Sequence, residues 1–174
     1  MAIEIERKFL LVGDGWRAAV HEVVVMAQGY LNDVHAVDSG AMNASVRVRI
    51  EGGQARLNIK SRELGASRQE FDYLIPMDDA RALLALCVGG VIDKHRHLVR
   101  HAGHLWEIDE FHGDNAGLVV AEIELDSEDE PFERPSWLGA EATHASRYYN
   151  LALASRPYAQ WNEAQRLATD LKER

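Results

Sequence analysis

Three charged residues, Glu4, Glu6 and Lys8, occupy every second position near the start of the chain. Strict alternation of this kind is typical of a β-strand, in which successive side chains point to opposite faces, so the three residues share one face. Two neighbouring carboxylates repel each other and need a counter-charge. Lys8 supplies part of it, and a divalent cation could supply more, because carboxylate oxygens suit Mg²⁺ or Mn²⁺. A solvent-facing strand alternates in the same way, so this stretch alone leaves both interpretations open.

The composition restricts the classes of protein that fit. The 174 residues are 47% hydrophobic and 27% charged, which is enough for one globular domain with a core. The net charge of −9 disfavours nucleic-acid binding, which usually needs a basic surface. Cys87 is the only cysteine, so no internal disulfide can form. No stretch resembles a signal peptide or reaches the length of a membrane-spanning helix, and we therefore expect a cytoplasmic protein without a membrane or nucleic-acid partner.

The elements that must position these residues are predicted from hydrophobic periodicity and turn residues. Alternation predicts strands over 3–11, 22–31, 44–51, 55–62, 67–76, 91–101, 105–111 and 118–126. Helical spacing predicts helices over 16–21 and 77–87, the second ended by Gly89 and Gly90, and 32–43 is expected to be a loop. The end of the chain is expected to be helical, including 158–172 after Pro157. We expect an α+β fold dominated by roughly eight antiparallel strands.

Charged residues recur at every second position in the later strands as well. Because the spacing is i, i+2, each set projects from one side of its strand. Basic side chains gather in the middle strands and carboxylates in the late strands, at Arg47, Arg49, Arg56, Lys60, Arg62, Lys94, Arg96, Arg100, Glu107, Asp109, Glu122 and Glu124.

Two architectures fit this pattern of charges. In the first, the apolar faces form a core and the charged faces meet water. In the second, the sheet closes into a barrel with the charged faces inside, and a ligand must offset the cost of burying them. A polyanion bound by the basic residues, with a metal ion on the carboxylates, would do so.

The series of motifs resembles the CYTH superfamily, the triphosphate tunnel metalloenzymes. The segment from Glu4 to Leu10 is similar to the ExExK signature of that family, and similar segments follow in order at 28–31, 46–49, 59–61, 68–70, 93–96, 106–109, 121–125 and 147–150. The resemblance covers about residues 3–154. It implies a closed eight-stranded antiparallel β-barrel, or tunnel, with a charged interior and helices packed outside. It also implies a CYTH triphosphate tunnel domain over 1–154, with 155–174 as a C-terminal helical extension of the same domain.

The resemblance assigns roles to residues by position. It implies that Mg²⁺ or Mn²⁺ is bound by Glu4, Glu6, Glu122 and Glu124. It also implies that Asp109, with Glu70 and Glu107 as further candidates, binds a second metal ion or its waters. It implies that a triphosphate is bound by Lys8, Arg47, Arg49, Lys60, Lys94, Arg96 and Arg147. Lys8 and Tyr30 are the implied catalytic residues, and Tyr30 could accept a proton from the attacking water if nearby cations lowered its pKa from about 10. A carboxylate that acts on this water is the alternative.

These implications lead to one expected function and several alternatives. We expect metal-dependent hydrolysis of inorganic tripolyphosphate to pyrophosphate and phosphate, a reaction that needs positioning and charge stabilisation more than covalent chemistry. The alternatives are hydrolysis of thiamine triphosphate or a nucleoside triphosphate, cyclisation of ATP as in class IV adenylate cyclases, and a polyphosphate-binding module without activity. We expect a triphosphate-containing small molecule as the partner, and a monomer or homodimer.

Four histidines lie close together in the sequence and raise the alternative of a zinc site. His95, His97 and His101 share the strand face opposite Lys94, so they point away from the charged site. With His104, they are therefore expected to be surface histidines.

Overall fold

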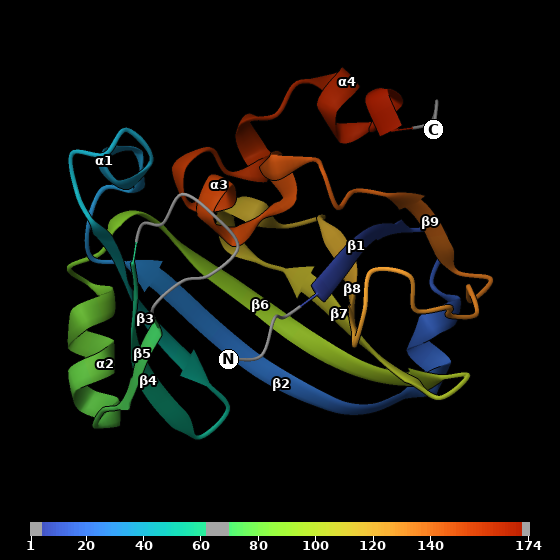
Figure 1. Ribbon diagram of the computed structural model, residues 1–174, viewed down its shortest axis with the longest axis horizontal. Coiled ribbons are helices and arrows are strands. Elements are labelled where there is room, and N and C mark those ends of the chain that lie inside the picture. The colour runs from blue at the N-terminus through green and yellow to red at the C-terminus, as the bar shows by residue number, and fades with distance from the viewer. Residues whose placement is uncertain (1–4, 62–69, 172–174) are drawn as a thin grey trace.

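The computed structural model describes residues 5–61 and 70–171, and within these ranges nine strands form one antiparallel sheet (Figure 1). The strand order is β5-β4-β3-β2-β6-β7-β8-β1-β9. The eight strands predicted from alternation are found, although parts of the first, fourth and fifth, at residues 3–4, 62 and 67–69, lie outside the described residues. The bounds are β1 Ile5–Leu11, β2 Val20–Tyr30, β3 Ala44–Glu51, β4 Gln54–Ser61, β5 Glu70–Leu74, β6 Val88–His101, β7 His104–Phe111, β8 Val119–Leu125 and β9 Leu138–Glu141.

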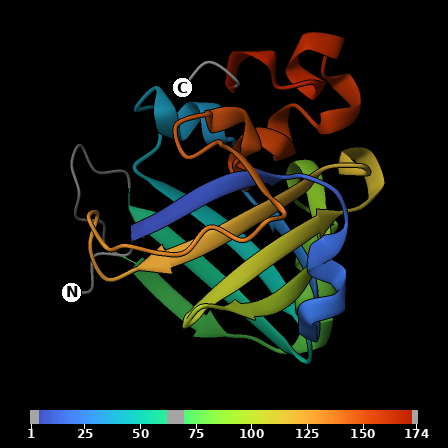
Figure 2. The ribbon, with the colours of Figure 1, turned by 90° about the vertical axis from the view of Figure 1, so that its right-hand side faces the viewer.

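Within the described residues, the sheet does not close into the expected eight-stranded barrel. Strand β1 pairs with β8 along one edge and with β9 along the other, so its second edge is occupied and cannot pair with β5. The expectation of a closed barrel is therefore wrong, and β9 is a strand that alternation did not predict. The open sheet curves strongly, so that β1 and β8 face β3 and β4 (Figure 2). Side chains of these strands line a cavity.

Short helices fill most of the connections. The helix predicted over 77–87 is found as α2, whereas the continuous helix expected over 158–172 is wrong, because this segment is divided into α4 and two short 3₁₀ turns. Helix α1 lies in the segment predicted as a loop, and it begins where the Asp33 side chain accepts a hydrogen bond from the backbone N–H of His35. The bounds are η1 Gly15–Ala19, α1 Val34–Asp38, α2 Met77–Leu84, η2 Gly113–Asn115, η3 Ser146–Tyr148, α3 Asn150–Ser155, η4 Tyr158–Gln160, α4 Glu163–Arg166 and η5 Thr169–Leu171.

The outer face of the sheet carries two apolar clusters. On β1, β7 and β8, Phe9, Trp106 and Ile123 are buried together with Trp16 of η1. Helix α2 covers the other end of the outer face, over β3 and β4, where Ala80 packs against Val48. Each large apolar side chain that is fully buried in this way contributes about 1.5–3 kcal/mol. The outer face therefore supplies a rigid support for the side chains on the inner face. No helix in the described part of the chain is long and apolar enough to cross a membrane.

The segment after β9 closes one end of the inner face. Tyr148, Leu153 and Trp161 pack there against Ile92 and Phe111 of β6 and β7, as the red helices above the sheet in Figure 1 show. We call this packed group of Tyr148, Leu153 and Trp161 the plug. The plug fills one end of the inner face, and the charged part of that face forms the wall of the cavity.

Gly89 permits the plug to approach β6 closely. It has φ of +78°, and a Cβ at this position would lie 2.9 Å from the backbone oxygen of Ala154 in α3. Gly89 and Gly90 were expected to end a helix, but the structure places both in β6. Because neither glycine has a side chain, the backbone of β6 can lie close to the backbone of α3.

Candidate active site

The strand registers bring the predicted charged residues to one face of the sheet. Lys8 lies opposite Glu122 and Glu6 lies opposite Glu124 in the β1–β8 pair. Arg96 lies opposite Asp109 in the β6–β7 pair, and the registers continue the same face to Arg47, Asn58 and Lys60 on β3 and β4. The side-chain alternation predicted from the sequence is therefore confirmed for these strands.

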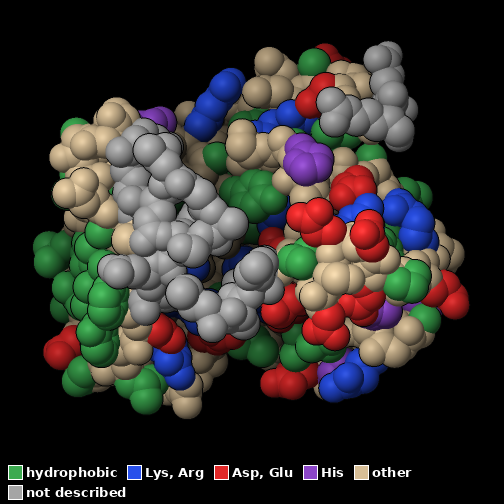
Figure 3. All heavy atoms as spheres, in the orientation of Figure 1, with side chains coloured by type: hydrophobic (Ala, Val, Ile, Leu, Met, Phe, Trp, Pro, Cys, Tyr) green, Lys and Arg blue, Asp and Glu red, His purple; other side chains and the backbone are tan. Residues whose placement is uncertain are grey.

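This inner face forms the wall of a cavity of about 790 Å³. The molecular surface is hollowed near the centre of the view in Figure 3, and basic side chains are visible within the hollow. One side of the cavity is lined by carboxylates and a lysine, and the other side is basic. The lining residues are Glu6, Lys8, Tyr30, His35, Ser45, Arg47, Asn58, Lys60, Glu122, Ser146, Tyr149, Asn150, Leu151, Ala152, Ser155 and Arg156.

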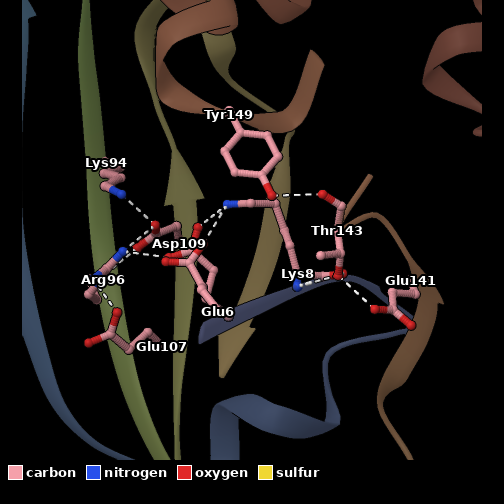
Figure 4. A network of polar contacts seen from close by, with 10 residues as sticks. Glu6, Lys8, Lys94, Arg96, Glu107, Asp109, Glu141, Thr143 and Tyr149 are labelled. Carbon is pink, nitrogen blue, oxygen red and sulfur yellow. Dashed lines mark hydrogen bonds and ion pairs between the residues drawn. The ribbon is translucent and has the colours of Figure 1, made fainter. Parts of the chain in front are cut away.

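Lys8 forms the centre of the acidic side. Its side chain is buried, it donates a hydrogen bond to Glu122, and its Nζ lies 3.6 Å from Oε1 of Glu6 (Figure 4). Burial disfavours the charged ammonium, but the carboxylates of Glu122 and Glu6 outweigh this effect and raise the pKa of Lys8 above its usual range. Lys8 is therefore a permanent cation at neutral pH.

A second group of ion pairs lies beneath the first, at the centre of the sheet. Asp109 is fully buried, accepts a hydrogen bond from Lys94, and accepts two more from Nε and Nη2 of Arg96 at 2.8 Å each. Arg96 also donates to Glu122 at 2.9 Å and to Glu107. Burial opposes the ionised form of Asp109, but Lys94 and Arg96 overcome it and lower its pKa to about 2. The two groups share Glu122 and form one continuous network.

The basic side of the cavity comes from β3 and β4. Arg47 and Lys60 line the cavity with Asn58 between them, and Nε of Arg47 has no hydrogen-bond partner among the described residues. A buried donor without a partner is costly unless a ligand satisfies it. An anion with several oxygen atoms would supply the acceptors that this side of the cavity needs.

Tyr30 lines the cavity beside Arg47. Burial raises the pKa of Tyr30 above its usual range, and the cation of Arg47 opposes this only in part. A proton acceptor would need the opposite shift. In this state of the protein, Tyr30 is therefore a neutral phenol that can donate a hydrogen bond.

Several of the predicted site residues lie outside the cavity wall. Arg147 donates two hydrogen bonds to Asp170 in the tail, at 2.6 and 2.7 Å, and stacks on Tyr148 and Trp161. Arg49 is on the inner face, with its Nε 3.3 Å from Oε2 of Glu51. Glu124 is exposed, while Glu4 and the side chain of Glu70 lie outside the described residues.

The carboxylates on the acidic side have the chemistry that a divalent cation requires. Glu6 and Glu122 already converge on one positive centre, the ammonium of Lys8, and their oxygens suit Mg²⁺ or Mn²⁺. Among the described residues, no group of three acidic, histidine or cysteine side chains is assembled around a common point. Asp109 accepts hydrogen bonds from Lys94 and Arg96, so it orients these two side chains and is also a candidate metal ligand.

His95, His97 and His101 lie on the side of the sheet opposite Lys94, as predicted. The expectation of surface histidines is wrong, because these three and His104 are half-buried. His97 contacts Trp16 with a ring-centroid separation of 5.0 Å and lies 3.1 Å from Glu110. His95 packs against His112. The described histidines do not form a group of three that could hold zinc.

The comparison with known proteins agrees with this arrangement. Residues 2–156 match the family model described as the CYTH domain. The chain belongs to the CYTH domain family. This CYTH protein is 40% identical over 164 residues to the inorganic triphosphatase of Acetivibrio thermocellus, and the match covers 94% of this chain and 100% of that protein. It is 36% identical over 156 residues to the inorganic triphosphatase of Nitrosomonas europaea, with 87% of this chain and 96% of that protein covered. A crystal structure of an inorganic triphosphatase is 33% identical, has a TM-score of 0.68, and is matched over 88% of this chain and 95% of its own.

Some residues that line the cavity were not predicted as site residues from the sequence of this CYTH protein. Asn58 could have been found, because it lies between Arg56 and Lys60 on the predicted basic face. Tyr149, Asn150 and Arg156 come from η3, α3 and their flanks. Alternation says nothing about these segments, because the packing of the plug on the sheet determines which of their side chains reach the cavity.

Proposed function

We propose that this CYTH protein hydrolyses a linear triphosphate in a metal-dependent reaction, with inorganic tripolyphosphate cleaved to pyrophosphate and phosphate. The observation that carries the proposal is a cavity with carboxylates and Lys8 on one side and Arg47 and Lys60 on the other. The inorganic triphosphatases that match this chain over most of its length support the same reaction. A triphosphate offers oxygen acceptors to the basic side of the cavity and oxygen ligands to a metal ion on the acidic side.

Basic side chains provide most of the catalysis in this proposal. Phosphoryl transfer passes through a loose transition state, so that positioning and charge stabilisation dominate. Arg47 and Lys60 bind one end of the triphosphate, and Lys8 faces the other end. Lys94 and Arg96 belong to the proposed phosphate path as well, and Asp109 holds the Arg96 guanidinium in a fixed orientation through two hydrogen bonds. The roles of Arg49 and Arg147 in binding phosphate stay predictions.

We propose Glu6, Glu122, Glu124 and Glu4 as the carboxylates that hold Mg²⁺ or Mn²⁺, with Asp109 as a further ligand. When bound there, a divalent cation would supply positive charge that offsets the charge developing on the phosphate oxygens. The convergence of Glu6 and Glu122 on the Lys8 ammonium supports this set.

The attacking water needs a group that orients it and a group that accepts its proton. We propose that Tyr30, as a neutral phenol beside Arg47, orients the water or a phosphate oxygen through its hydroxyl. A carboxylate such as Glu6 on the opposite side accepts the proton, because the raised pKa of Tyr30 makes its phenolate a rare species.

The division of the chain into 1–154 and an extension over 155–174 is also proposed. The contact of Trp161 in the tail with Tyr148, with ring centroids 5.1 Å apart, supports the extension as part of the same domain. The cytoplasmic location, the absence of nucleic-acid and membrane partners, and a monomeric or homodimeric state stay predictions.

A parallel assay of substrates tests the proposed function. Phosphate release is measured from tripolyphosphate, thiamine triphosphate and ATP, each with Mg²⁺, with Mn²⁺ and with chelator. We expect metal-dependent release that is fastest with tripolyphosphate. Faster cleavage of thiamine triphosphate or ATP would replace the proposed substrate, cyclic AMP formed from ATP would indicate a cyclase, and binding without release would indicate a polyphosphate-binding module.

A further inference from the structure

Tyr149 forms a closed loop of contacts with Lys8. The ammonium of Lys8 lies over the Tyr149 ring, 4.6 Å from its centroid. The Tyr149 hydroxyl donates a hydrogen bond of 2.7 Å to the backbone oxygen of Thr143. The backbone N–H of Lys8 donates in turn to the Thr143 hydroxyl at 3.1 Å. Tyr149 and the backbone of Lys8 are therefore both bonded to Thr143, which fixes the position of the ring relative to Lys8 (Figure 4).

Further contacts hold the Thr143 end of this loop in place. The Thr143 hydroxyl donates to Oε1 of Glu141 at 2.7 Å. Glu141 accepts two hydrogen bonds from Arg7, at 2.9 and 2.6 Å. The backbone N–H of Ala142 donates to the Lys8 oxygen at 2.7 Å. These bonds hold Arg7 and Lys8 of β1 to residues 141–143. The contacts between Lys8, Thr143 and Tyr149 are therefore a fixed part of the structure around the cavity.

The ring limits the positions that the Lys8 ammonium can adopt. A lysine side chain has four rotatable bonds and three donors, so it can point in many directions. Glu122 and Glu6 attract the ammonium from one side, and the face of the Tyr149 ring contacts it from another, where the ring is attractive to a cation. The ring keeps the ammonium at the cavity surface, because Tyr149 lines the same cavity.

We propose that Tyr149 is a positioning residue for the proposed triphosphatase reaction, and that it acts by holding the Lys8 ammonium between Glu6 and Glu122 for contact with a phosphate oxygen. The role rests on the proposed function, but the contact itself does not. Tyr149 needs no ionised form for this role, and burial raises the pKa of its hydroxyl, which keeps the phenol neutral.

The contact can be observed without any activity. The chain has four lysines, so selective ¹³C labelling of lysine produces few NMR signals. Ring currents from Tyr149 should displace the ε-methylene proton signals of Lys8 in the wild-type protein. We expect the displacement to persist in Tyr149→Phe and to disappear in Tyr149→Leu. Lys8→Arg assigns the signal. A Lys8 signal unchanged by Tyr149→Leu would overturn the proposed contact.

Kinetics then test whether the contact matters for the reaction. Loss of a partly buried cation–π contact predicts that Tyr149→Leu lowers kcat/KM for tripolyphosphate by roughly 3- to 30-fold, with a smaller decrease for Tyr149→Phe. The loss should fall mainly on kcat, and Tyr149→Phe should retain most of the activity because the ring is still present. A purely structural role would lower the free energy of unfolding without this split between kcat and KM.

Tyr148→Leu is the matched control, because Tyr148 is the neighbouring tyrosine and packs on Trp161 away from Lys8. We expect it to reduce the free energy of unfolding while leaving the Lys8 signals and kcat for tripolyphosphate unchanged. Equal decreases of kcat in Tyr148→Leu and Tyr149→Leu would overturn the proposal. If the wild-type protein cleaves no triphosphate, the proposed function fails, and the NMR signals still decide whether Tyr149 holds Lys8.

Discussion

Asp109→Asn is the substitution that perturbs the buried charge network most directly. Asp109 is fully buried, and its carboxylate neutralises Lys94, whose side chain is 1% exposed, and Arg96. Asparagine keeps the shape but removes the negative charge, and its amide N–H₂ would face two cationic donors. Removal of one partner from a buried ion pair usually costs about 3–5 kcal/mol, because the remaining charge stays buried without compensation.

The pKa of Asp109 leads to a similar magnitude. Burial opposes ionisation, but Lys94 and Arg96 lower the pKa from 3.8 to about 2, which corresponds to roughly 2–3 kcal/mol at neutral pH. Because the folded-state pKa is the lower one, this stabilisation is present above about pH 4 and is lost as the pH falls through about 2. Asp109→Asn should therefore also flatten the dependence of stability on pH in this acidic range.

Urea unfolding followed by circular dichroism at pH 7 measures the effect. With a slope of roughly 2 kcal/mol per molar urea, a loss of about 3 kcal/mol lowers the midpoint by roughly 1.5 M. Asp72→Asn is the control, since Asp72 pairs with Arg56 at 2.7 Å on the same sheet but is 35% exposed; its loss should stay below about 1 kcal/mol. Equal midpoint shifts for the two variants would refute the assignment of Asp109 as the centre of the network.

Three further substitutions test other parts of the structure. Glu6→Gln should abolish metal-dependent cleavage of tripolyphosphate with little change in the unfolding midpoint, and near-normal turnover would exclude Glu6 as a metal ligand. Gly89→Ala should cost about 1–3 kcal/mol in urea unfolding, because φ is +78° and α3 is in contact, whereas Gly13→Ala, with φ of +68° and open space around it, should cost about 1 kcal/mol. Arg147→Ala should leave KM for tripolyphosphate within about twofold and loosen the tail, because Arg147 binds Asp170; a tenfold rise in KM would instead support the phosphate-binding role implied by the family resemblance.

The alternation of charged and apolar residues was sufficient to predict which side chains share the inner face. Glu6 and Lys8 lie on the strand face opposite Ile5 and Phe9, and the register with β8 follows from this alternation because a shift by one residue would expose Phe9. Residues with strong local signals, such as the apolar stripe of α2, were also predicted correctly. The ordered motifs identified the family.

The closure of the sheet could not be predicted in the same way, because it depends on contacts between distant segments. Strand β9 has four residues, one of them Gly139, and no alternation of its own. It is a strand because Val12 and Ala142 donate backbone hydrogen bonds across the free edge of β1, to Trp137 and Lys8. That pairing occupies the edge on which an eight-stranded barrel would have closed.

The tail after Pro157 was predicted as one helix because its apolar and polar residues follow an amphipathic pattern. In the structure it is divided into short turns. Trp161 is buried in the same cluster as Tyr148 and Leu153, and Ala168 is buried as well. Positive φ at Ala168 (51°) ends this helical segment. Burial of the aromatic side chain therefore outweighs local helix propensity, which contributes only a few tenths of a kcal/mol per residue.

The reaction itself is tested most directly by the products of tripolyphosphate with and without metal. Tripolyphosphate is incubated with the wild-type protein in Mg²⁺, and the products are separated by ion-exchange chromatography, with chelator and Glu6→Gln as parallel samples. We expect equal amounts of pyrophosphate and phosphate from the wild-type protein in Mg²⁺, and intact tripolyphosphate in the other two samples. Equal cleavage in the presence of chelator, or intact tripolyphosphate in all three samples, would contradict a metal-dependent triphosphatase site in this cavity.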